Sequence, residues 1–375
     1  MIKKILIANR GEIAVRIVRA CAEMNIRSVA IYSDADRQAL HVKRADEAYG
    51  IGDDPLAGYL NPRKLVNLAV ETGCDALHPG YGFLSENAEL AEICAERGIR
   101  FIGPSAEVIR RMGDKTEARR SMIKAGVPVT PGTEGNVADI AEALREGDRI
   151  GYPVMLKATS GGGGRGIRRC NSREELEQAF PRVISEATKA FGSAEVFLEK
   201  CIVNPKHIEA QILADSFGNT VHLYERDCSI QRRNQKLIEI APSPQLTPEQ
   251  RAYIGDLAVR AAQAVGYENA GTVEFLLAEG EVYFMEMNTR VQVEHTITEE
   301  ITGIDIVREQ IRIASGLPLS IKQEDIQYRG FALQFRINAE DPRNNFLPSF
   351  GKITRYYAPG GPGCLLYTSD AADDS

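Results

Sequence analysis

The sequence predicts an α/β fold in which a parallel sheet at the N-terminus is followed by a larger α+β region. Short apolar segments alternate with amphipathic helical segments between residues 4 and 103, and this alternation is typical of a parallel sheet covered on both faces. Farther along the chain, extended segments pair around turns, as antiparallel strands do. The length of 375 residues suggests two or three domains with ample core.

Composition and charge exclude several classes of partner. Hydrophobic residues make up 43% of the chain and charged residues 26%, an ordinary globular composition. The net charge of −7 argues against a nucleic-acid partner bound through a basic surface. No apolar run is long enough for a membrane helix, and Met1–Ile5 lead into a strand without a signal peptide. We therefore expect a cytoplasmic protein with no membrane contact, whose seven scattered cysteines are reduced.

The first domain begins with an apolar strand at residues 4–8 and a turn at Asn9–Glu12 that leads into an amphipathic helix. Further expected elements are a strand at 28–32, a helix at 62–72, a strand at 76–78, a helix at 86–97 and a strand at 101–103. The turn at Gly11 could mark a dinucleotide site, but it lacks the three-glycine fingerprint. We interpret Gly11 as a plain turn residue and this domain as a scaffold.

The remaining elements follow from periodicity, capping signals and turns. We expect helices at 105–125, 137–147, 248–265 and 304–314, and one that opens with the capping box Ser172–Glu175. Strands are expected at 152–158, 167–170, 196–200, 207–214, 221–225, 272–277, 282–287, 331–337 and 352–357.

Polar residues alternate with mostly apolar ones along the segment Glu286–His295. In an extended chain alternate side chains share a face, so one face would carry Glu286, Asn288, Arg290, Gln292 and Glu294. Two carboxylates, two amides and a guanidinium can bind a cation and an anion side by side. The alternative is an edge strand with a solvated polar face.

A glycine run at residues 159–166 follows the strand that ends near Lys157. It contains a GxGxxG pattern, but an extended segment follows it where a Rossmann turn would begin a helix, and no Gly-Lys-Ser/Thr makes it a Walker A loop. The bare backbone amides of four consecutive glycines can close over phosphates. A flexible hairpin tip is the alternative, but Lys157 and Arg165 add the positive charge that phosphates need.

Glu274 lies in the hairpin that leads to Glu286. The two carboxylates can face each other only if the loop has an odd number of residues or a strand has a bulge, and a loop centred on Gly280 would meet this condition. A tight two-residue Glu279–Gly280 turn is expected to place them on opposite faces. If they converge, Glu274, Glu286 and Asn288 form an oxygen-rich site for Mg²⁺.

Other polar positions have two interpretations each. His207 and Glu209 alternate on one strand face, as they would on any half-buried strand. Lys115 is a surface lysine unless it faces the same cleft as Lys157. The segment Arg226–Lys236 is dense in long polar donors, which suit a polyanionic ligand as well as a solvated loop.

Together these segments resemble the biotin carboxylase component of biotin-dependent carboxylases, which has an ATP-grasp fold. The resemblance extends from about Ile2 to Gly363 and rests on residues 7–14, 78–87, the glycine run, 225–236 and 286–295. Residues 236–242 are most similar to the stand-alone biotin carboxylase subunit of pyruvate carboxylases, with acetyl-CoA carboxylases as the other related class. The resemblance implies a Rossmann-like domain at 1–110, an ATP-grasp domain at 111–312 with a mobile glycine-rich lid at about 129–201, and a shortened C-terminal domain with an incomplete sheet at 313–363.

The family reaction implied by this resemblance has two steps. ATP phosphorylates bicarbonate to carboxyphosphate, and the CO₂ that this releases carboxylates the ureido nitrogen of biotin. No Ala-Met-Lys-Met biotinyl site occurs in the chain, so the biotin is expected on a separate carrier protein, with a carboxyltransferase subunit as the further partner. The final acceptor is the choice of that transferase.

The resemblance also implies roles for single residues. Nucleotide contacts are implied for Lys115, Lys157, Gly162, Gly163, Gly164, Glu199, Lys200, Ile202, His207, Gln231 and Asn234. Mg²⁺ or Mn²⁺ would be held by Glu274, Glu286 and Asn288. Bicarbonate would be held by Arg290, Gln292, the Val293 backbone and Lys236 and deprotonated by Glu294, and Arg336 would stabilise the biotin enolate.

The chain departs from the family pattern at several places. Asn234 stands where the family usually has histidine near the ribose, so weaker nucleotide binding is expected, and Thr296 and Phe350 stand where it usually has proline. Residues 364–375 form a tail unlike the family, which suggests a truncated reading frame. Arg19 and Glu23, one helical turn apart, resemble a homodimer contact of the family, with a plain surface ion pair as the alternative.

Two other functions remain open at this point. Another ATP-grasp ligase, such as a carbamoyl-phosphate or purine-pathway enzyme, would share the lysines, the glycine loop and the metal carboxylates. It would give no reason for the Arg290–Glu294 segment together with Arg336. A nucleotide-binding regulatory remnant without catalytic activity would fit the altered C-terminus and Asn234.

Overall fold

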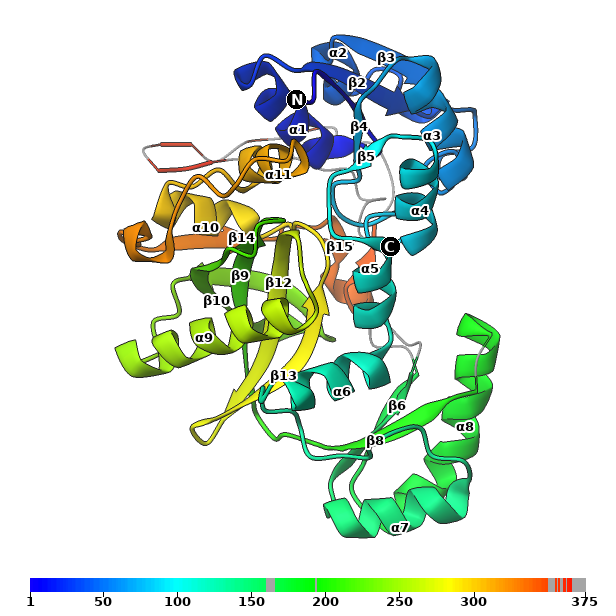
Figure 1. Ribbon diagram of the computed structural model, residues 1–375. Coiled ribbons are helices and arrows are strands. Elements are labelled where there is room, and N and C mark those ends of the chain that lie inside the picture. The colour runs from blue at the N-terminus through cyan, green and yellow to red at the C-terminus, as the bar shows by residue number, and fades with distance from the viewer. Residues whose placement is uncertain are drawn as a thin grey trace. The chain divides into compact units, whose positions relative to one another are not determined.

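The structure is a computed structural model that describes residues 1–159, 166–192, 194–349, 355, 357, 360, 361 and 363–365 (Figure 1). Two compact units divide the chain. The first comprises residues 1–103, 307–316 and 335–375, and the second comprises residues 104–306 and 317–334. The glycine run within the expected lid and the strand expected at 352–357 fall largely outside the described residues.

A parallel sheet with strand order β3-β2-β1-β4-β5 forms the first unit. This order, with the first strand inside the sheet and crossovers to both sides, is Rossmann-like and agrees with the predicted α/β fold. Leu6 and Leu77 of the strands pack with Leu65 and Leu90 of the helices. The elements are β1 (Lys4–Ile7), α1 (Gly11–Glu23), β2 (Arg27–Tyr32), η1 (Asp34–Asp36), α2 (Leu40–Arg44), β3 (Glu47–Gly50), α3 (Pro62–Glu71), β4 (Ala76–His78), α4 (Ala88–Glu96), β5 (Arg100–Phe101), α11 (Ile306–Ala314), β15 (Glu340–Asp341), η3 (Pro342–Asn344) and β16 (Leu347–Pro348).

The turn after β1 is closed by its own side chains. Asn9 Nδ2 donates to the carbonyl oxygens of Pro79 at 2.8 Å and Tyr81 at 2.7 Å. Gly80 has a φ of +65°, and a Cβ there would lie 2.8 Å from Asn9 Nδ2, so only glycine fits the position. The carboxyl ends of β1 and β4 are thus tied together, as expected for a scaffold.

The second unit is built on a sheet with strand order β13-β12-β9-β10-β11-β14. Helix α9 covers one face, where Ile254 and Leu257 pack with Ile212, Val273 and Phe275. Because strand side chains alternate, the residues next to these in sequence lie on the opposite face. The elements of this sheet and its helices are α5 (Ala106–Gly113), α6 (Lys115–Lys124), β9 (Lys206–Ala214), β10 (Thr220–Arg232), β11 (Gln235–Ala241), α9 (Pro248–Ala264), β12 (Asn269–Ala278), β13 (Glu281–Asn288), α10 (His295–Thr302), η2 (Gln323–Asp325) and β14 (Ala332–Phe335).

A smaller sheet of the same unit has the order β7-β6-β8. Its core joins Leu156 of β6 and Leu198 of β8 to Leu144 and Leu176 of the flanking helices. The elements are α7 (Ile140–Ile150), β6 (Val154–Ala158), β7 (Ile167–Cys170), α8 (Arg173–Phe191) and β8 (Val196–Lys200). They flank the glycine run on both sides.

Two local predictions were wrong, and several elements were missed. The helix expected at 105–125 is two helices, because the Asp114 carboxylate accepts from the backbone N–H groups of Thr116 and Glu117, both at 2.9 Å, and starts α6. The capping box before α8 is only half formed, since Glu175 accepts from the Asn171 N–H at 2.8 Å. The sequence patterns also missed α2, β3, β11 and α10.

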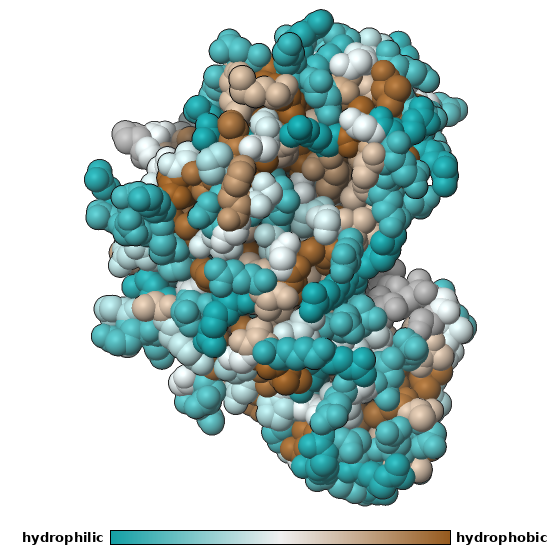
Figure 2. All heavy atoms as spheres, in the orientation of Figure 1, coloured by the Kyte–Doolittle hydropathy of each residue, from teal (hydrophilic) through white to brown (hydrophobic). Residues whose placement is uncertain are grey.

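Among the described residues, every helix is too short or too polar to cross a bilayer. On the face drawn in Figure 2, hydrophobic side chains are interspersed among hydrophilic ones.

Candidate active site

A β-bulge in strand β13 determines that the side chains of Glu274 and Glu286 lie on the same face of the sheet. The hairpin tip is the two-residue turn Glu279–Gly280, with positive φ at both residues, so the expected loop centred on Gly280 was wrong. The expectation that a two-residue turn would place the carboxylates on opposite faces was also wrong, because it took no account of a bulge. Near the tip Phe275 pairs with Phe284, but Glu274 pairs with Glu286, which leaves Met285 as an extra residue in β13. The extra residue shifts the pairing by one position, so the two carboxylates lie opposite each other on one face.

The segment after Glu286 is not one extended strand, as the alternation suggested. Strand β13 ends at Asn288, the chain bends at Thr289 and Arg290, and α10 starts at His295 with Glu294 as its N-cap residue. Gln292 and Glu294 are still buried, and both reach the same cluster as Glu274. The predicted polar set converges through a strand end and a helix start, which alternation alone could not show.

Lys236 of β11 lies at the centre of this cluster and contacts three carboxylates. Its Nζ donates to Glu209 Oε2 at 2.5 Å, Glu294 Oε1 at 2.8 Å and Glu274 Oε1 at 3.0 Å. Burial disfavours the charged amine, but these three carboxylates raise its pKa well above the usual value. The predicted general base Glu294 and the predicted anion contact Lys236 are therefore direct neighbours.

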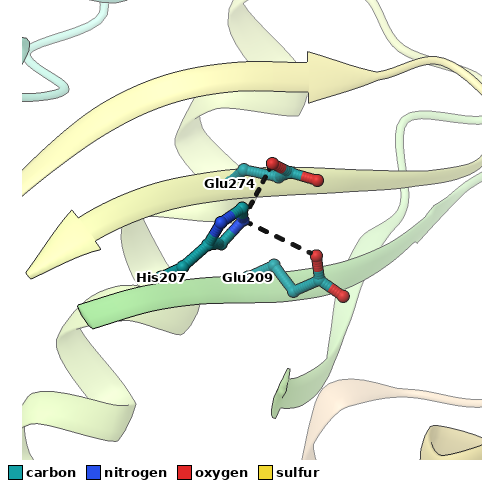
Figure 3. A group of neighbouring side chains, drawn as sticks. All are labelled: His207, Glu209 and Glu274. Atoms are coloured by element: carbon teal, nitrogen blue, oxygen red, sulfur yellow. Dashed lines mark ion pairs between the residues drawn. The ribbon is translucent and has the colours of Figure 1, made fainter. Parts of the chain in front are cut away.

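His207 and Glu209 rise from β9 beside Glu274 of β12 (Figure 3). His207 Nε2 lies 2.8 Å from Glu274 Oε2 and 4.0 Å from Glu209 Oε2. Burial lowers the pKa of His207, but Glu274 outweighs this and raises it above the ordinary value. The pKa of Glu209 is lowered although burial opposes ionisation, because Arg226 and Lys236 face it. Glu209 was not among the predicted site residues, and its alternation with His207 was the signal.

Amides and a guanidinium border the carboxylates. Asn288 Nδ2 donates to Glu274 Oε1 at 2.8 Å, Gln292 Nε2 donates to the same oxygen at 3.0 Å, and Arg290 Nη2 donates to Asn288 Oδ1 at 3.1 Å. Asn288 and Gln292 are buried, and Arg290 is half-buried. The arrangement places one cation, Arg290, beside donors that could hold a small anion next to Lys236.

Segment 226–236 is a β-hairpin rather than a solvated loop. Strands β10 and β11 meet at Arg233–Asn234, where both residues have positive φ and both are exposed. Gln231 Nε2 lies 2.9 Å from His207 Nδ1. The hairpin thereby brings Gln231 and Lys236 to the cluster, while Asn234 occupies its tip.

Arg226, which the sequence suggested as a ligand donor, is completely buried. Its guanidinium donates to Glu209 Oε1 at 2.5 Å and to four further side-chain acceptors, which are Gln211, Thr272, Gln292 and Thr298. The residue therefore contacts the cluster from inside the protein. Its position depends on acceptors spread from residue 209 to residue 298, so the local sequence carried no signal for it.

The predicted nucleotide contacts of the smaller sheet form a second group. Lys157 of β6 pairs with the Glu199 carboxylate of β8, and Arg119 Nη1 lies 3.5 Å from Glu199 Oε1. Burial lowers the pKa of Lys115, with Glu286 opposing the shift and Lys157 adding to it. Lys115 is thus within electrostatic reach of both Lys157 and Glu286. Arg119 was not predicted.

The remaining predicted residues have other positions. Lys200 Nζ donates to the carbonyl oxygens of Gly151 at 2.7 Å and Tyr152 at 3.1 Å. Ile202 and Val293 are half-buried. Arg336 follows β14 and belongs to the first unit. Gly162, Gly163 and Gly164 lie outside the described residues.

Among the described residues, several sets of side chains could hold a metal ion, and two of them contain Glu274. Ligand atoms of His207, Glu209 and Glu274 lie within 4.8 Å of one another, but the Lys236 ammonium group already occupies the space between Glu209 and Glu274. Glu274, Glu286 and Asn288 offer only oxygen ligands, the donor type that Mg²⁺ prefers, and the bulge brings the two carboxylates face to face. The second set fits Mg²⁺ better, provided that Glu274 gives up its hydrogen bond from Asn288 Nδ2 and the Asn288 amide turns its oxygen toward the carboxylates.

Comparison with known families matches both parts of the chain. Residues 1–109 match the family model described as biotin carboxylase, N-terminal domain. Residues 114–322 match the model described as carbamoyl-phosphate synthase L chain, ATP binding domain.

Individual relatives are similar over nearly the whole chain. The 2-oxoglutarate carboxylase small subunit of Hydrogenobacter thermophilus is 58% identical over 97% of this chain and 77% of its own length. Biotin carboxylase 1 of Bacillus subtilis is 56% identical over 97% of this chain and 81% of its own.

Solved structures are similar as well. The biotin carboxylase domain dimer of the Hydrogenobacter thermophilus 2-oxoglutarate carboxylase, in complex with MgADP, ADP and bicarbonate, has a TM-score of 0.95 and 56% identity, covering 99% of this chain and 82% of that one. A Campylobacter jejuni biotin carboxylase in complex with β,γ-ATP has a TM-score of 0.94 and 47% identity, covering 99% and 85%.

Proposed function

Because this chain belongs to the biotin carboxylase family, we propose that it catalyses the ATP-dependent carboxylation of carrier-bound biotin. Bicarbonate is the carboxyl source and carboxyphosphate the intermediate. The product is carboxybiotin, the outcome of the first half-reaction of a biotin-dependent carboxylase. The complexes of solved relatives with MgADP, bicarbonate and a form of ATP support this choice of substrates.

One observation carries the proposal. Glu294 Oε1 lies 2.8 Å from Lys236 Nζ, inside a group that also contains Gln292 and, through Asn288, Arg290. A general base must lie within hydrogen-bond reach of the proton that it removes. Bicarbonate held by Lys236 and Arg290 would present its hydroxyl proton to Glu294, and the resulting dianion would be held by the same cations.

Phosphate and metal contacts complete the mechanism. Lys115, Lys157 and His207 are proposed to hold the nucleotide phosphates, and positive groups at these positions would stabilise charge on the transferring phosphoryl group. Mg²⁺, when held by Glu274, Glu286 and Asn288, would neutralise negative charge on those phosphates. The glycines Gly162–Gly164 are proposed to cover them, and the segment Glu199–Ile202 is proposed to recognise the adenine.

Partners and location extend the proposal. We propose a biotin carboxyl carrier protein and a carboxyltransferase subunit as partners, and Arg336 as the residue that stabilises the biotin enolate. A homodimer is supported by the dimeric Hydrogenobacter thermophilus domain. Arg19 and Glu23 are proposed as its contact residues, and within this chain Glu23 lies 3.8 Å from Arg308. Free, mostly buried cysteines support a reducing, cytoplasmic location.

The test is bicarbonate-dependent ATP cleavage and its stimulation by free biotin. We expect both activities in the purified chain, and we expect Glu294→Gln to lower turnover by about 10²–10⁴-fold, the usual contribution of a general base. ATP binding, measured by calorimetry, stays nearly unchanged. Glu300→Gln is the matched control, because Glu300 is exposed on the same helix.

Two outcomes would contradict the proposal. If the wild-type chain cleaves ATP without requiring bicarbonate and without stimulation by biotin, another ATP-grasp ligase or a regulatory nucleotide-binding protein is favoured. Loss of ATP binding in the Glu294→Gln variant would contradict the assignment of Glu294 as the base.

A further inference from the structure

The guanidinium of Arg226 has every donor engaged by a different side chain. Nε donates to Glu209 Oε1 at 2.5 Å, and Nη1 donates to Gln211 Oε1 at 2.8 Å and Thr298 Oγ1 at 2.9 Å. Nη2 donates to Gln292 Oε1 at 2.8 Å and Thr272 Oγ1 at 3.1 Å. These five bonds use all five N–H groups of an arginine, and the side chain is 0% exposed.

The first consequence concerns the Gln292 amide. Arg226 can only donate, so the Gln292 atom that faces it must be the oxygen. The amide nitrogen then points the other way and donates to Glu274 Oε1 at 3.0 Å. Arg226 therefore decides which end of the amide is presented to the predicted bicarbonate position.

The second consequence concerns Lys236. Glu209 uses Oε1 for Arg226 and Oε2 for Lys236 Nζ. With one oxygen fixed from behind, the other directs the ammonium group toward Glu294, 2.8 Å away. Arg226 thus acts on both partners of the predicted bicarbonate contact while it is itself fully buried.

From this geometry we propose that Arg226 is a positioning residue of the carboxylation reaction, which sets the Gln292 amide and the Glu209–Lys236–Glu294 row for bicarbonate. The proposal rests on the function proposed above. Strands β9 and β12, the loop after β13 and helix α10 all supply acceptors, so a purely structural role in joining these elements is the competing explanation. The two explanations differ in the kinetic constant that changes.

The central variant is Arg226→Lys, which keeps the charge but offers three donors on one atom in place of a planar fork. We expect the KM for bicarbonate to rise by about tenfold or more, because several buried acceptors near the site lose their partner. The KM for ATP and the affinity for MgADP change by less than about twofold, since the nucleotide contacts lie on other side chains.

Two further variants separate positioning from stability. Thr298→Val removes one acceptor of Arg226 without touching Gln292 or Glu209, and we expect a smaller rise of the bicarbonate KM, about two- to fivefold. Arg251→Lys is the matched control, because Arg251 donates to Glu225 at 2.8 Å and to the Ser243 carbonyl oxygen at 3.0 Å on the same sheet. It is expected to lower thermal stability while leaving the bicarbonate KM unchanged.

A crystal structure of the Arg226→Lys variant tests the positioning role without an enzyme assay. We expect a retained fold, a displaced Gln292 side chain and a broken contact between Lys236 and Glu294. If the wild-type chain lacks bicarbonate-dependent cleavage, the proposed function fails, whereas this structural result still reports on the positions that Arg226 sets. An unaltered site geometry, or equal changes in the KM values for ATP and bicarbonate, would overturn the positioning role.

Discussion

Each unit contains a buried group of charged side chains, and the two groups differ in how their charges balance. In the first unit Arg10 donates to Asp36 Oδ1 at 2.7 Å, and Tyr59 and Ser33 donate to Oδ2 at 2.7 Å and 3.1 Å. One carboxylate thus has one cation and neutral donors. In the second unit Lys236 and Arg226 face the three carboxylates Glu209, Glu274 and Glu294.

The difference separates a group that stabilises the fold from one that is ready for ligands. The Asp36 group is charge-balanced and closed, and burial together with Asp36 raises the pKa of Tyr59. The Lys236 group balances only when His207 carries a proton, and the side chains of Lys236 and His207 keep 13% and 12% of their surface exposed. Surplus carboxylates beside partly exposed side chains are where a metal ion can be accommodated.

The largest effect on stability is expected in the Asp36 group, which we call the closed group. Asp36→Asn removes the charge that faces Arg10 while keeping the size of the side chain. We expect the free energy of unfolding of the first unit to fall by about 3 kcal/mol, because breaking a buried pair leaves a buried charge behind. Urea unfolding followed by circular dichroism measures the change, with Asp34→Asn at an exposed position as the control.

A smaller loss of stability is expected from the same kind of change in the Lys236 group, which we call the open group. Glu209→Gln keeps an acceptor for Arg226 and leaves Lys236 with Glu274 and Glu294, so we expect a loss of about 1–2 kcal/mol. Removing one of three neighbouring negative charges also relieves repulsion. A loss as large as that of Asp36→Asn would mean that both groups serve stability alike.

The open group also predicts a pH dependence. The pKa of His207 is raised in the folded state, so its contact with Glu274 stabilises the fold fully below the unfolded pKa of about 6.5 and is lost as pH rises through the folded value. We expect the free energy of unfolding of the ligand-free wild type to exceed that of the His207→Gln variant at pH 6. The difference should shrink as the pH rises through the folded pKa of His207. A gap that widens with pH would reverse the assigned protonation.

The smallest expected effect concerns the reactivity of the cysteines near the two groups. Burial raises the pKa of Cys21 in the first unit to about 12, and burial and then Glu209 raise that of Cys228 beside the open group. We expect neither thiol to react with an aromatic disulfide reagent at pH 8 in the native protein, whereas the exposed Cys364 reacts. Rapid reaction of a further thiol in the Cys364→Ser variant would show that solvent enters one of the groups.

Much of the fold followed from periodicity, and the misses have identifiable physical causes. Apolar strands such as β1 and β4 and the amphipathic helix α1 were predicted, because their pattern is set by the core they face. The helix break at Asp114 was missed because one side chain can cap a helix inside a continuous periodic run. Strand β11 was missed because its partner β10 is longer than its apolar pattern suggested.

Predictions about the site succeeded where one strand carries the pattern and failed where distant segments meet. Glu274 and Glu286 were recognised as a pair only under a condition on register, and the bulge that satisfies it has no local signal. The Arg226 group draws its acceptors from β9, β12, the loop after β13 and α10. Such a group depends on tertiary packing, so local sequence patterns do not reveal it.

The bulge at Met285 also determines where this hairpin tolerates additional residues. It lies between the carboxylate pair and the exposed Glu279–Gly280 tip, so the strands between them pair in their own register. A peptide inserted between Glu279 and Gly280 would lengthen the tip without turning Glu286 to the opposite face. The tip is therefore a suitable attachment point for a fluorescent label, whereas a single deletion at Met285 would reverse one carboxylate and separate the pair.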